Sequence, residues 1–556
     1  MNTRQWFKSG SPWIWLTGGM ISLSMIMVFG LLALIAVRGL GHFWPAPVVE
    51  FEYHPDPENT VRVLGNPMRS QNVTGLVLRE SGHLIPEDVD LTQRFLIKQG
   101  NRDLTGRDFF WYPEPLISEW TTPREAMVVE RREWGDFIGF LSQVKQDGVV
   151  IAEGYAGKDK LLPLVARANE LAGEINHIER YEIGGLNMRL ERIRLAERGL
   201  ERNVDLEPAE VQRRLAELQA ERDELDRQYE GINARRLDLL AQMRRDILVA
   251  ESMDGRRVEI PLAHVVHVHW PNDMTLVQKM GHYVTMVWGF LSGFPREANT
   301  EGGIFPAIFG TVLMVILMSI VVTPMGVLAA IYLREYAKQG PIVRLVRISV
   351  NNLAGVPSIV FGVFGLAFFV YFVGGNLDRM FYQDSLPAPT FGTPGLVWAS
   401  LTLALLTLPV VIVSTEEGLA RIPSTIRHGS LALGATKAET LWRTVIPLST
   451  PAMMTGLILA VARAAGEVAP LMLVGVVKLA PNLPVDGYFP YLHLERKFMH
   501  LGFHIYDVGF QSPNVEASRP LVYATALVLV LIIITLNLTA ITIRNYLREK
   551  YRSESD

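Results

Sequence analysis

Long apolar runs recur along this chain and alternate with polar stretches of very unequal length. A helix needs about 20 predominantly apolar residues to cross the hydrocarbon core of a bilayer. Six segments meet that requirement, and we expect each to be a transmembrane helix, so the fold class is an all-α polytopic membrane protein. The predicted spans are residues 13–37, 304–331, 348–373, 396–413, 452–477 and 521–543.

The polar stretch between the first two spans, residues 38–303, is long enough to fold by itself. Within it, residues 51–150 contain short β-rich runs that Pro and Gly interrupt, which predicts a sheet-containing lobe. Residues 253–270 return to the alternation of a strand. The predicted spans therefore carry an α+β insertion.

The middle of the insertion, residues 158–252, has the period of a helix. Asp205 can cap a second helix, and Pro208 suits its first turn. We expect an antiparallel helical hairpin, whose arms of about 40 residues would each extend roughly 60 Å. Arg222 and Arg236 occupy seam positions, which indicates an exposed seam or a further partner. The alternative is a spacer that packs only on itself. Apolar residues recur at Leu164, Ala168, Leu171, Ile175 and Ile178, and again at Val211, Leu215, Leu218, Leu225 and Leu239.

Basic residues in short loops predict the orientation, because such loops stay on the cytoplasmic side. Every cluster falls on the same side, which places residues 1–12 and 544–556 inside and the insertion outside. A cleaved signal peptide is the rival interpretation of residues 13–37, but this apolar run is longer than a signal core of about 7 to 15 residues. The clusters are Arg4 and Lys8; Arg334, Lys338, Arg344 and Arg347; Arg421, Arg427, Lys437 and Arg443; and Arg544, Arg548, Lys550 and Arg552.

The chain contains no Cys, which excludes disulfides and thiolate metal sites. Its net charge of -4 over 556 residues argues neither for nor against a nucleic acid partner. Three histidines, His264, His267 and His269, raise the alternative of a metal site. No carboxylate or thiolate completes a convincing ligand set beside them, so we expect no metal.

Two ionisable residues, Arg463 and Glu467, lie deep in the fifth predicted span. A central Arg costs about 2.5 to 3.5 kcal/mol on insertion scales, so such residues usually face a wet cavity, a bundle interior or a substrate. The spacing of four would place both side chains on one face of a helix. The pair is therefore a candidate substrate pathway, and the alternative is a structural ion pair.

The loop between the fourth and fifth spans, residues 416–447, reads as helix, Gly turn, helix and Pro stop. Gly434 provides the backbone freedom for the turn. Such an element suits docking into a groove of a cytoplasmic partner. The candidate docking residues are Glu417, Arg427, His428, Gly429, Ser430, Gly434, Ala435, Thr436, Ile446 and Pro447.

This loop resembles the coupling loop of ABC importer permeases, with His428-Gly429-Ser430 in place of the family's E-A-A start and Ile446-Pro447 in place of its Leu-Pro end. Four other segments, 299–306, 323–333, 355–362 and 463–470, resemble the PstA type of phosphate-specific permease in the same order. The resemblance covers about residues 271–544. It implies a type I ABC importer fold and transport of inorganic phosphate, with Arg463 and Glu467 on the path.

The resemblance also implies the partners: a second permease subunit of the PstC type, an ATPase dimer of the PstB type and a periplasmic phosphate-binding protein of the PstS type. This chain has no G-x-x-x-x-G-K-[ST] phosphate loop. We therefore expect ATP and Mg to be used by the partner ATPase, and no cofactor or enzymatic activity in this chain. The expected location is the cell inner membrane.

Two other functions stay open at the level of sequence. A membrane-anchored sensor or adaptor could act through its outward hairpin, although it would not need charges inside the bundle. An ABC permease for another oxyanion, such as sulfate or molybdate, would keep the coupling loop.

Overall fold

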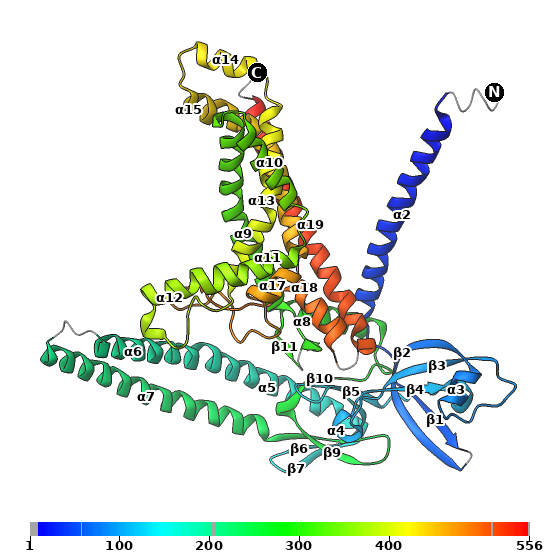
Figure 1. Ribbon diagram of the computed structural model, residues 1–556. Coiled ribbons are helices and arrows are strands. Elements are labelled where there is room, and N and C mark those ends of the chain that lie inside the picture. Colours follow the sequence, from blue (N-terminus) through cyan, green and yellow to red (C-terminus); the bar gives the residue numbers. More distant parts are fainter. Residues whose placement is uncertain (1–8, 57, 203–206, 297–298, 513–514, 554–556) are drawn as a thin grey trace. The chain divides into compact units, whose positions relative to one another are not determined.

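The computed structural model describes residues 9–553 apart from 57, 203–206, 297–298 and 513–514 (Figure 1). The chain forms two compact units. The membrane unit comprises Met1–Phe43, Ile304–Tyr382 and Ala388–Asp556. The insertion unit comprises Trp44–Gly303 and Gln383–Pro387. The predicted cap Asp205 lies outside the described residues.

The membrane unit contains, among the described residues, six helices that are long and apolar enough to cross a membrane. Four of the six predicted spans agree closely with these helices, and the third and fifth do not. The spans are built from α2 (Ser11–Gly41), α9 (Phe305–Ile331), α11 (Ser358–Phe364) with η7 (Gly365–Gly374) and α12 (Gly375–Phe381), α13 (Leu396–Ala420), α16 (Ile446–Gly466) and α19 (Val515–Ser553).

The third span starts about ten residues later than the sequence predicts. A separate amphipathic helix, α10 (Pro341–Leu353), ends before Pro357, and the span itself begins at Ser358. Proline lacks the backbone N–H of a helix and disfavours helical geometry in the residue before it. The apolar face of α10 extended the hydropathic run, so the predicted boundary at residue 348 is wrong.

The fifth predicted span, residues 452–477, is not one helix. α16 begins at Ile446 and ends at Gly466, and Glu467 has extended backbone angles of φ −79° and ψ 135°. A short helix, α17 (Ala469–Val474), follows with Pro470 in its first turn. Glycine favours the end of a helix because it loses more backbone entropy than other residues when it becomes helical. A proline that follows lacks the N–H group that would continue the hydrogen-bond pattern of the helix. Glu467 is therefore the first residue beyond the helix, although its side chain still lies beside that of Arg463 at the spacing of four.

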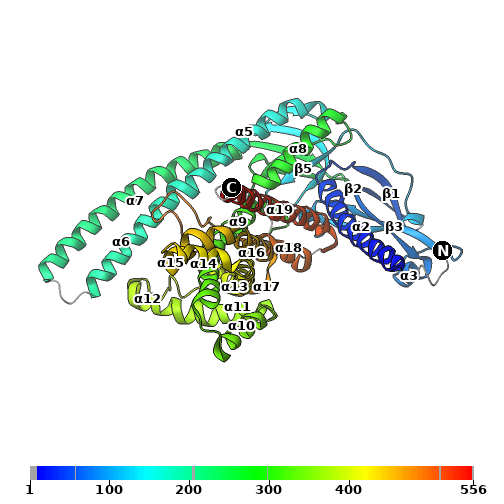
Figure 2. The ribbon, with the colours of Figure 1, turned by 90° about the horizontal axis from the view of Figure 1, so that it is seen from above.

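The core of the membrane unit lies between α9, α13 and α16, which pack side by side (Figure 2). Met318, Leu403 and Ala460 are fully buried there. Small residues allow the backbones to approach: a Cβ added to Gly456 would lie 2.8 Å from Cβ of Ser414. Close packing of this kind is the main source of helix association in a membrane.

A stretch of irregular chain links α17 to the last span. It ends in α18 (Leu501–Tyr506) and the π-helical turn η10 (Asp507–Gln511). Asp486 fixes part of it by accepting hydrogen bonds from Arg496 Nη1 at 2.6 Å and from His493 Nε2 at 2.9 Å. The sequence analysis did not anticipate this segment.

The insertion unit contains two antiparallel sheets and a small hairpin. One sheet has the order β1-β2-β3-β4, and the other has the order β10-β5-β6-β8-β9 with β7 paired to β6. The predicted segment 51–150 is thus divided between both sheets, and its later strands share the second sheet with segment 253–270. The strands are β1 (Val49–Asp56), β2 (Asn59–Thr74), β3 (Leu91–Lys98), β4 (Phe109–Pro113), β5 (Ala126–Arg131), β6 (Phe137–Gln146), β7 (Val149–Glu153), β8 (Asp246–Glu251), β9 (Arg257–Pro261), β10 (Val265–His269), β11 (Pro295–Arg296) and β12 (Glu301–Gly302).

Long helices connect β7 to β8 within this unit. They are α5 (Lys158–His177), the π-helical turn η3 (Ile178–Ile183), α6 (Gly184–Arg202) and α7 (Pro208–Arg244). Leu161 and Val165 of α5 pack on the second sheet. The two arms run antiparallel, because Arg236 pairs with Glu179 at 2.7 Å while Arg222 pairs with Glu197 at 3.8 Å. Both seam arginines thus form ion pairs across the hairpin.

Shorter helices complete the unit. α3 (Gly75–Glu80) and α4 (Arg102–Thr105) lie between strands, and α8 (Leu276–Ser292) follows β10. The sequence analysis did not predict α8 as a separate helix.

Candidate functional site

The candidate pathway residues Arg463 and Glu467 lie at the end of α16. Arg463 occupies the last turn of this helix, and Glu467 is the first residue beyond it. Arg463 Nε lies 3.5 Å from Glu467 Oε1, which is within ion-pair distance. Their side chains are 33% and 20% exposed. The break in the helix thus brings the two charges together without burying them.

The guanidinium of Arg463 keeps most of its donors available. An Arg side chain has five N–H donors in a planar fork. Within the described part of the chain, no hydrogen bond from this guanidinium occurs. Thr455, Leu459 and Gly466 share the exposed side of α16 with it. The arrangement can present two N–H groups to an oxyanion from the surface of the helix.

The coupling loop contains two short helices joined by a glycine turn. α14 spans Ser424–Ala432, Gly434 has a φ of +91°, and α15 spans Lys437–Thr440. The Ala435 N–H donates to the Ser430 carbonyl, which closes the turn. A positive φ of this size favours glycine, as the sequence analysis expected.

The predicted Pro stop is wrong. α15 continues through a π-helical turn, η9 (Leu441–Val445), into α16, where Pro447 lies in the first turn. The missing N–H of Pro447 coincides with the change from π-helical to α-helical turns, where the regular hydrogen-bond pattern is already interrupted. The loop therefore leads into the fifth span without a break.

Polar contacts inside the loop hold its second helix. Thr436 Oγ1 and Glu439 form a capping box at the start of α15. The hydroxyl oxygens of Ser430 and Thr440 lie 2.9 Å apart and join the two helices. His428 and Glu417 are exposed, and Gly429 has open space around its Cα. Ile446 is the first residue of α16.

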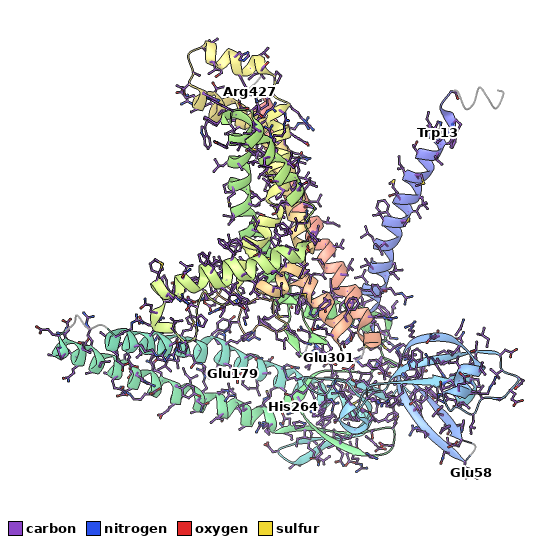
Figure 3. The ribbon with its side chains drawn as sticks, viewed as in Figure 1. Trp13, Glu58, Glu179, His264, Glu301 and Arg427 are labelled. Carbon is purple, nitrogen blue, oxygen red and sulfur yellow. The ribbon has the colours of Figure 1, made fainter. Side chains whose placement is uncertain are left out.

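Arg427 faces the body of the membrane unit. Its Nη2 donates to Glu335 Oε1 at 2.9 Å and to the Leu419 carbonyl at 2.7 Å, while Nη1 donates to the Ile422 carbonyl at 2.8 Å. Figure 3 labels Arg427 at the base of this loop. The side chains of Arg427 and Glu335 are 19% and 12% exposed. Arg427 is therefore an anchor for the loop.

The exposed apolar residues of this region were missed by the sequence analysis. Leu433 is 91% exposed beside the Gly434 turn, and Leu431 and Trp442 are also exposed. Exposed apolar side chains at the tip of a loop, outside the long apolar helices, are typical of a docking element. The signal was present in the sequence as Leu431-Ala432-Leu433 before the turn.

A cavity of about 510 Å³ lies beside the coupling loop. It is lined by the end of α13, by α14, by the first turns of α16 and by the end of α19. Arg421, Arg544 and Arg548 contribute to its wall.

The three histidines of the metal alternative lie in the insertion unit. His269 stacks on His282 with ring centroids 4.4 Å apart, and burial lowers the pKa of His269 to about 3. The His264 carbonyl accepts the Arg132 N–H at 2.7 Å. Throughout the residues that the structure covers, no three His, Asp or Glu side chains gather in a way that could hold a metal ion.

Comparison with known proteins identifies a family and several relatives of this chain. Residues 322–553 match the family described as the binding-protein-dependent transport system inner membrane component. The phosphate transport system permease protein PstA of Mycobacterium leprae is 39% identical over 31% of this chain and 52% of its own length, so that alignment spans about half of the relative. PstA 1 of Mycobacterium tuberculosis CDC 1551 is 32% identical over 51% of this chain and 83% of its own.

The PstA protein of Yersinia pestis is 30% identical over 44% of this chain and 74% of its own length. A solved MetNI methionine ABC transporter chain covers 47% of this chain and 98% of itself, at 17% identity and a TM-score of 0.32. The assignment rests on the sequence relatives and on the six membrane-spanning helices. This multi-pass inner membrane protein belongs to the PstA-type permeases of ABC importers.

Proposed function

We propose that this chain is the permease subunit through which an ABC importer moves inorganic phosphate into the cytoplasm. The observation that carries the proposal is the 32% identity to a phosphate transport permease along 83% of that relative's length. The half-exposed Arg463 supports it, because an oxyanion crossing hydrocarbon needs a fixed positive partner. A guanidinium fork matches two phosphate oxygens at once.

Glu467 has one of two roles on this path. It accepts a hydrogen bond from a phosphate hydroxyl, which would disfavour fully ionised sulfate, or it restrains Arg463. The extended backbone at Glu467 leaves its carboxylate 3.5 Å from the guanidinium, which suits both roles.

The partners follow from the family. An ABC importer requires an ATPase and a substrate-binding protein, and we assign these to the PstB and PstS types, with a PstC-type second permease. ATP and Mg belong to the ATPase. The exposed Leu433 tip, with the candidate docking residues Glu417, His428, Gly429 and Ser430 behind it, is the surface for that ATPase.

Orientation follows from charge. Clusters of Lys and Arg at the coupling-loop side favour the cytoplasm, so both termini lie inside. The insertion unit, joined to the ends of α2 and α9, then lies in the periplasm.

The test is radiolabelled phosphate uptake at low external phosphate in cells that lack this gene. Restored uptake on expression of this chain, with no competition from excess sulfate or molybdate, is the expected result. Competition by either anion would indicate that the transporter carries that oxyanion and not phosphate alone. Failure to restore uptake, at normal membrane abundance and with the partner subunits present, would favour the sensor or adaptor.

A further inference from the structure

The cavity beside the coupling loop has a distinctive charge distribution. Arg421, Arg544 and Arg548 line it, and Arg544 and Arg548 are four residues apart on α19, so they share a face of that helix. Within the described ranges no carboxylate pairs with any of the three guanidinium groups. Three cations without a carboxylate partner form a site for an anion.

The remaining wall of the cavity is apolar. Ile422, Leu448 and Pro451 contribute to it. A free ion would gain nothing from such a wall, whereas an acyl chain would be buried there. The combination of a cationic rim with an apolar wall is typical of a pocket for an anionic lipid between membrane helices.

The depth of the cavity fits the same ligand. Arg421 directly follows the last residue of α13, and Arg544 directly follows the predicted apolar run of α19. Both mark the level at which apolar side chains give way to charge, which is where the phosphates of a leaflet lie. We propose that this cavity binds a phosphate group, and the apolar wall favours the phosphodiester of an anionic lipid over free phosphate.

The test uses the complete transporter, purified from membranes and reconstituted with phosphatidylglycerol and phosphatidylcholine. Mass spectrometry of co-purifying lipid compares Arg421→Gln/Arg544→Gln with Arg334→Gln/Arg344→Gln, two exposed arginines that lie outside the cavity. The first pair should lower retained phosphatidylglycerol at least roughly tenfold, because it removes two of the three guanidinium groups that would donate to the phosphate. The second pair should leave it unchanged.

A second arm separates the two sources of phosphate. Millimolar inorganic phosphate added before lipid extraction should not displace the lipid; displacement would assign the cavity to free phosphate. Equal lipid loss in both pairs of variants would show that lipid retention depends on general surface charge and not on this cavity, which would overturn the proposal. So would the absence of both retained lipid and phosphate binding in the wild-type transporter.

A different observation concerns α8 in the insertion unit. Its 17 residues contain one Lys and no Arg, Asp or Glu. One side is covered, with Phe290 buried and His282 against His269. The other side is exposed, and Val277, Val284 and Trp288 form an uncharged stripe along it at helical spacing.

The chain ties this helix to the membrane spans. β11 pairs with β12, so that the Gly303 N–H donates to the Phe294 carbonyl at 3.0 Å, close to the end of α8. Phe305, the first residue of α9, is only two positions further. Trp44, three residues after α2, packs against Tyr283 of α8 with ring centroids 6.0 Å apart. Short segments of chain therefore connect α8 to α9, and its partner Trp44 to α2.

We infer that α8 lies in the outer interface of the bilayer with its uncharged stripe in lipid. An amphipathic helix of this kind buries its apolar face by about 5 to 10 Å. Trp288 and Tyr283 are the residue types that favour the headgroup level. Because only short segments of chain separate α8 and Trp44 from two membrane spans, lipid, rather than a protein, is the occupant that we infer.

Because the chain has no Cys, a single one can report on this face. Val284→Cys, labelled with bimane in the reconstituted transporter, is compared with Val149→Cys, an equally exposed valine on β7 of the same unit. Doxyl lipid should quench the label at 284 roughly twofold more than the label at 149, and iodide the reverse. Iodide quenching at both positions, or protection of 284 from both quenchers by a protein partner, would overturn the inference.

Discussion

Two arginine–glutamate pairs in the membrane unit differ in what surrounds them. Arg427 and Glu335 are largely buried, 2.9 Å apart, and Arg427 also donates to two backbone carbonyls. Arg463 and Glu467 are half-buried and 3.5 Å apart, with no hydrogen bond from the guanidinium within the described ranges. In the first pair, both terminal nitrogens of Arg427 donate to groups of the fold. In the second pair, the N–H donors of Arg463 stay available, as expected of a residue that binds and releases a substrate.

The largest expected effect comes from breaking the first pair. Arg427→Gln leaves the largely buried Glu335 carboxylate unpaired, and the cost of about 3 to 5 kcal/mol for removing one partner of a fully buried pair is an upper bound for it. We expect a lower thermal unfolding midpoint in detergent and lower membrane abundance. Arg347→Gln is the matched control, since its pair with Glu416 is more exposed, and its loss should be smaller. Equal stability of both variants would show that the Arg427–Glu335 pair contributes no more to the free energy of unfolding than the Arg347–Glu416 pair.

The second effect concerns the far end of the loop that Arg427 anchors. Gly434→Ala places a side chain at a φ of +91°, where left-handed geometry costs about 1 to 2 kcal/mol for an L-residue. We expect phosphate uptake to fall while membrane abundance stays near normal. Gly173→Ala, in α5 and with open space around it, should keep uptake. Normal uptake with Gly434→Ala would count against the role of this turn in docking.

The smallest effect is expected at Glu467. Glu467→Gln keeps the size of the side chain and removes its charge. If this carboxylate accepts a phosphate hydroxyl, competition by sulfate should rise by a few-fold, within the range of a single hydrogen bond of about 1 kcal/mol. Competition assays on the wild type and the variant measure this. An unchanged preference would leave Glu467 only as a restraint on Arg463.

The sequence predicted those features that depend on local pattern. Hydropathy located the six apolar regions, and the glycine requirement located the turn at Gly434. It misplaced the third span because the apolar face of α10 runs up to Pro357 without a change in hydropathy. It joined α16 to α17 because the break at Gly466 lies within a run that is apolar apart from Arg463 and Glu467.

Long-range pairing was beyond the reach of sequence pattern. Glu335 precedes Arg427 by 92 residues, and only the packing of the helices brings them together. From the sequence, Arg427 was therefore predicted to be an exposed docking residue of the coupling loop. The spacing of four predicted that Arg463 lies beside Glu467, but it could not show that the guanidinium makes no hydrogen bond within the described ranges. The helix end at Gly466 gives that pair a different geometry.

The central claim is that Arg463 lies on the substrate path. ATP-driven uptake of radiolabelled phosphate into proteoliposomes that contain the complete transporter tests it most directly, with wild type, Arg463→Gln and Arg463→Lys at equal protein. We predict at least a roughly tenfold loss for the Gln variant, from the loss of one or more charged hydrogen bonds. The Lys variant, which keeps the charge without the fork, should be intermediate. Wild-type uptake by both variants would contradict the claim and return Arg463 to a structural ion pair.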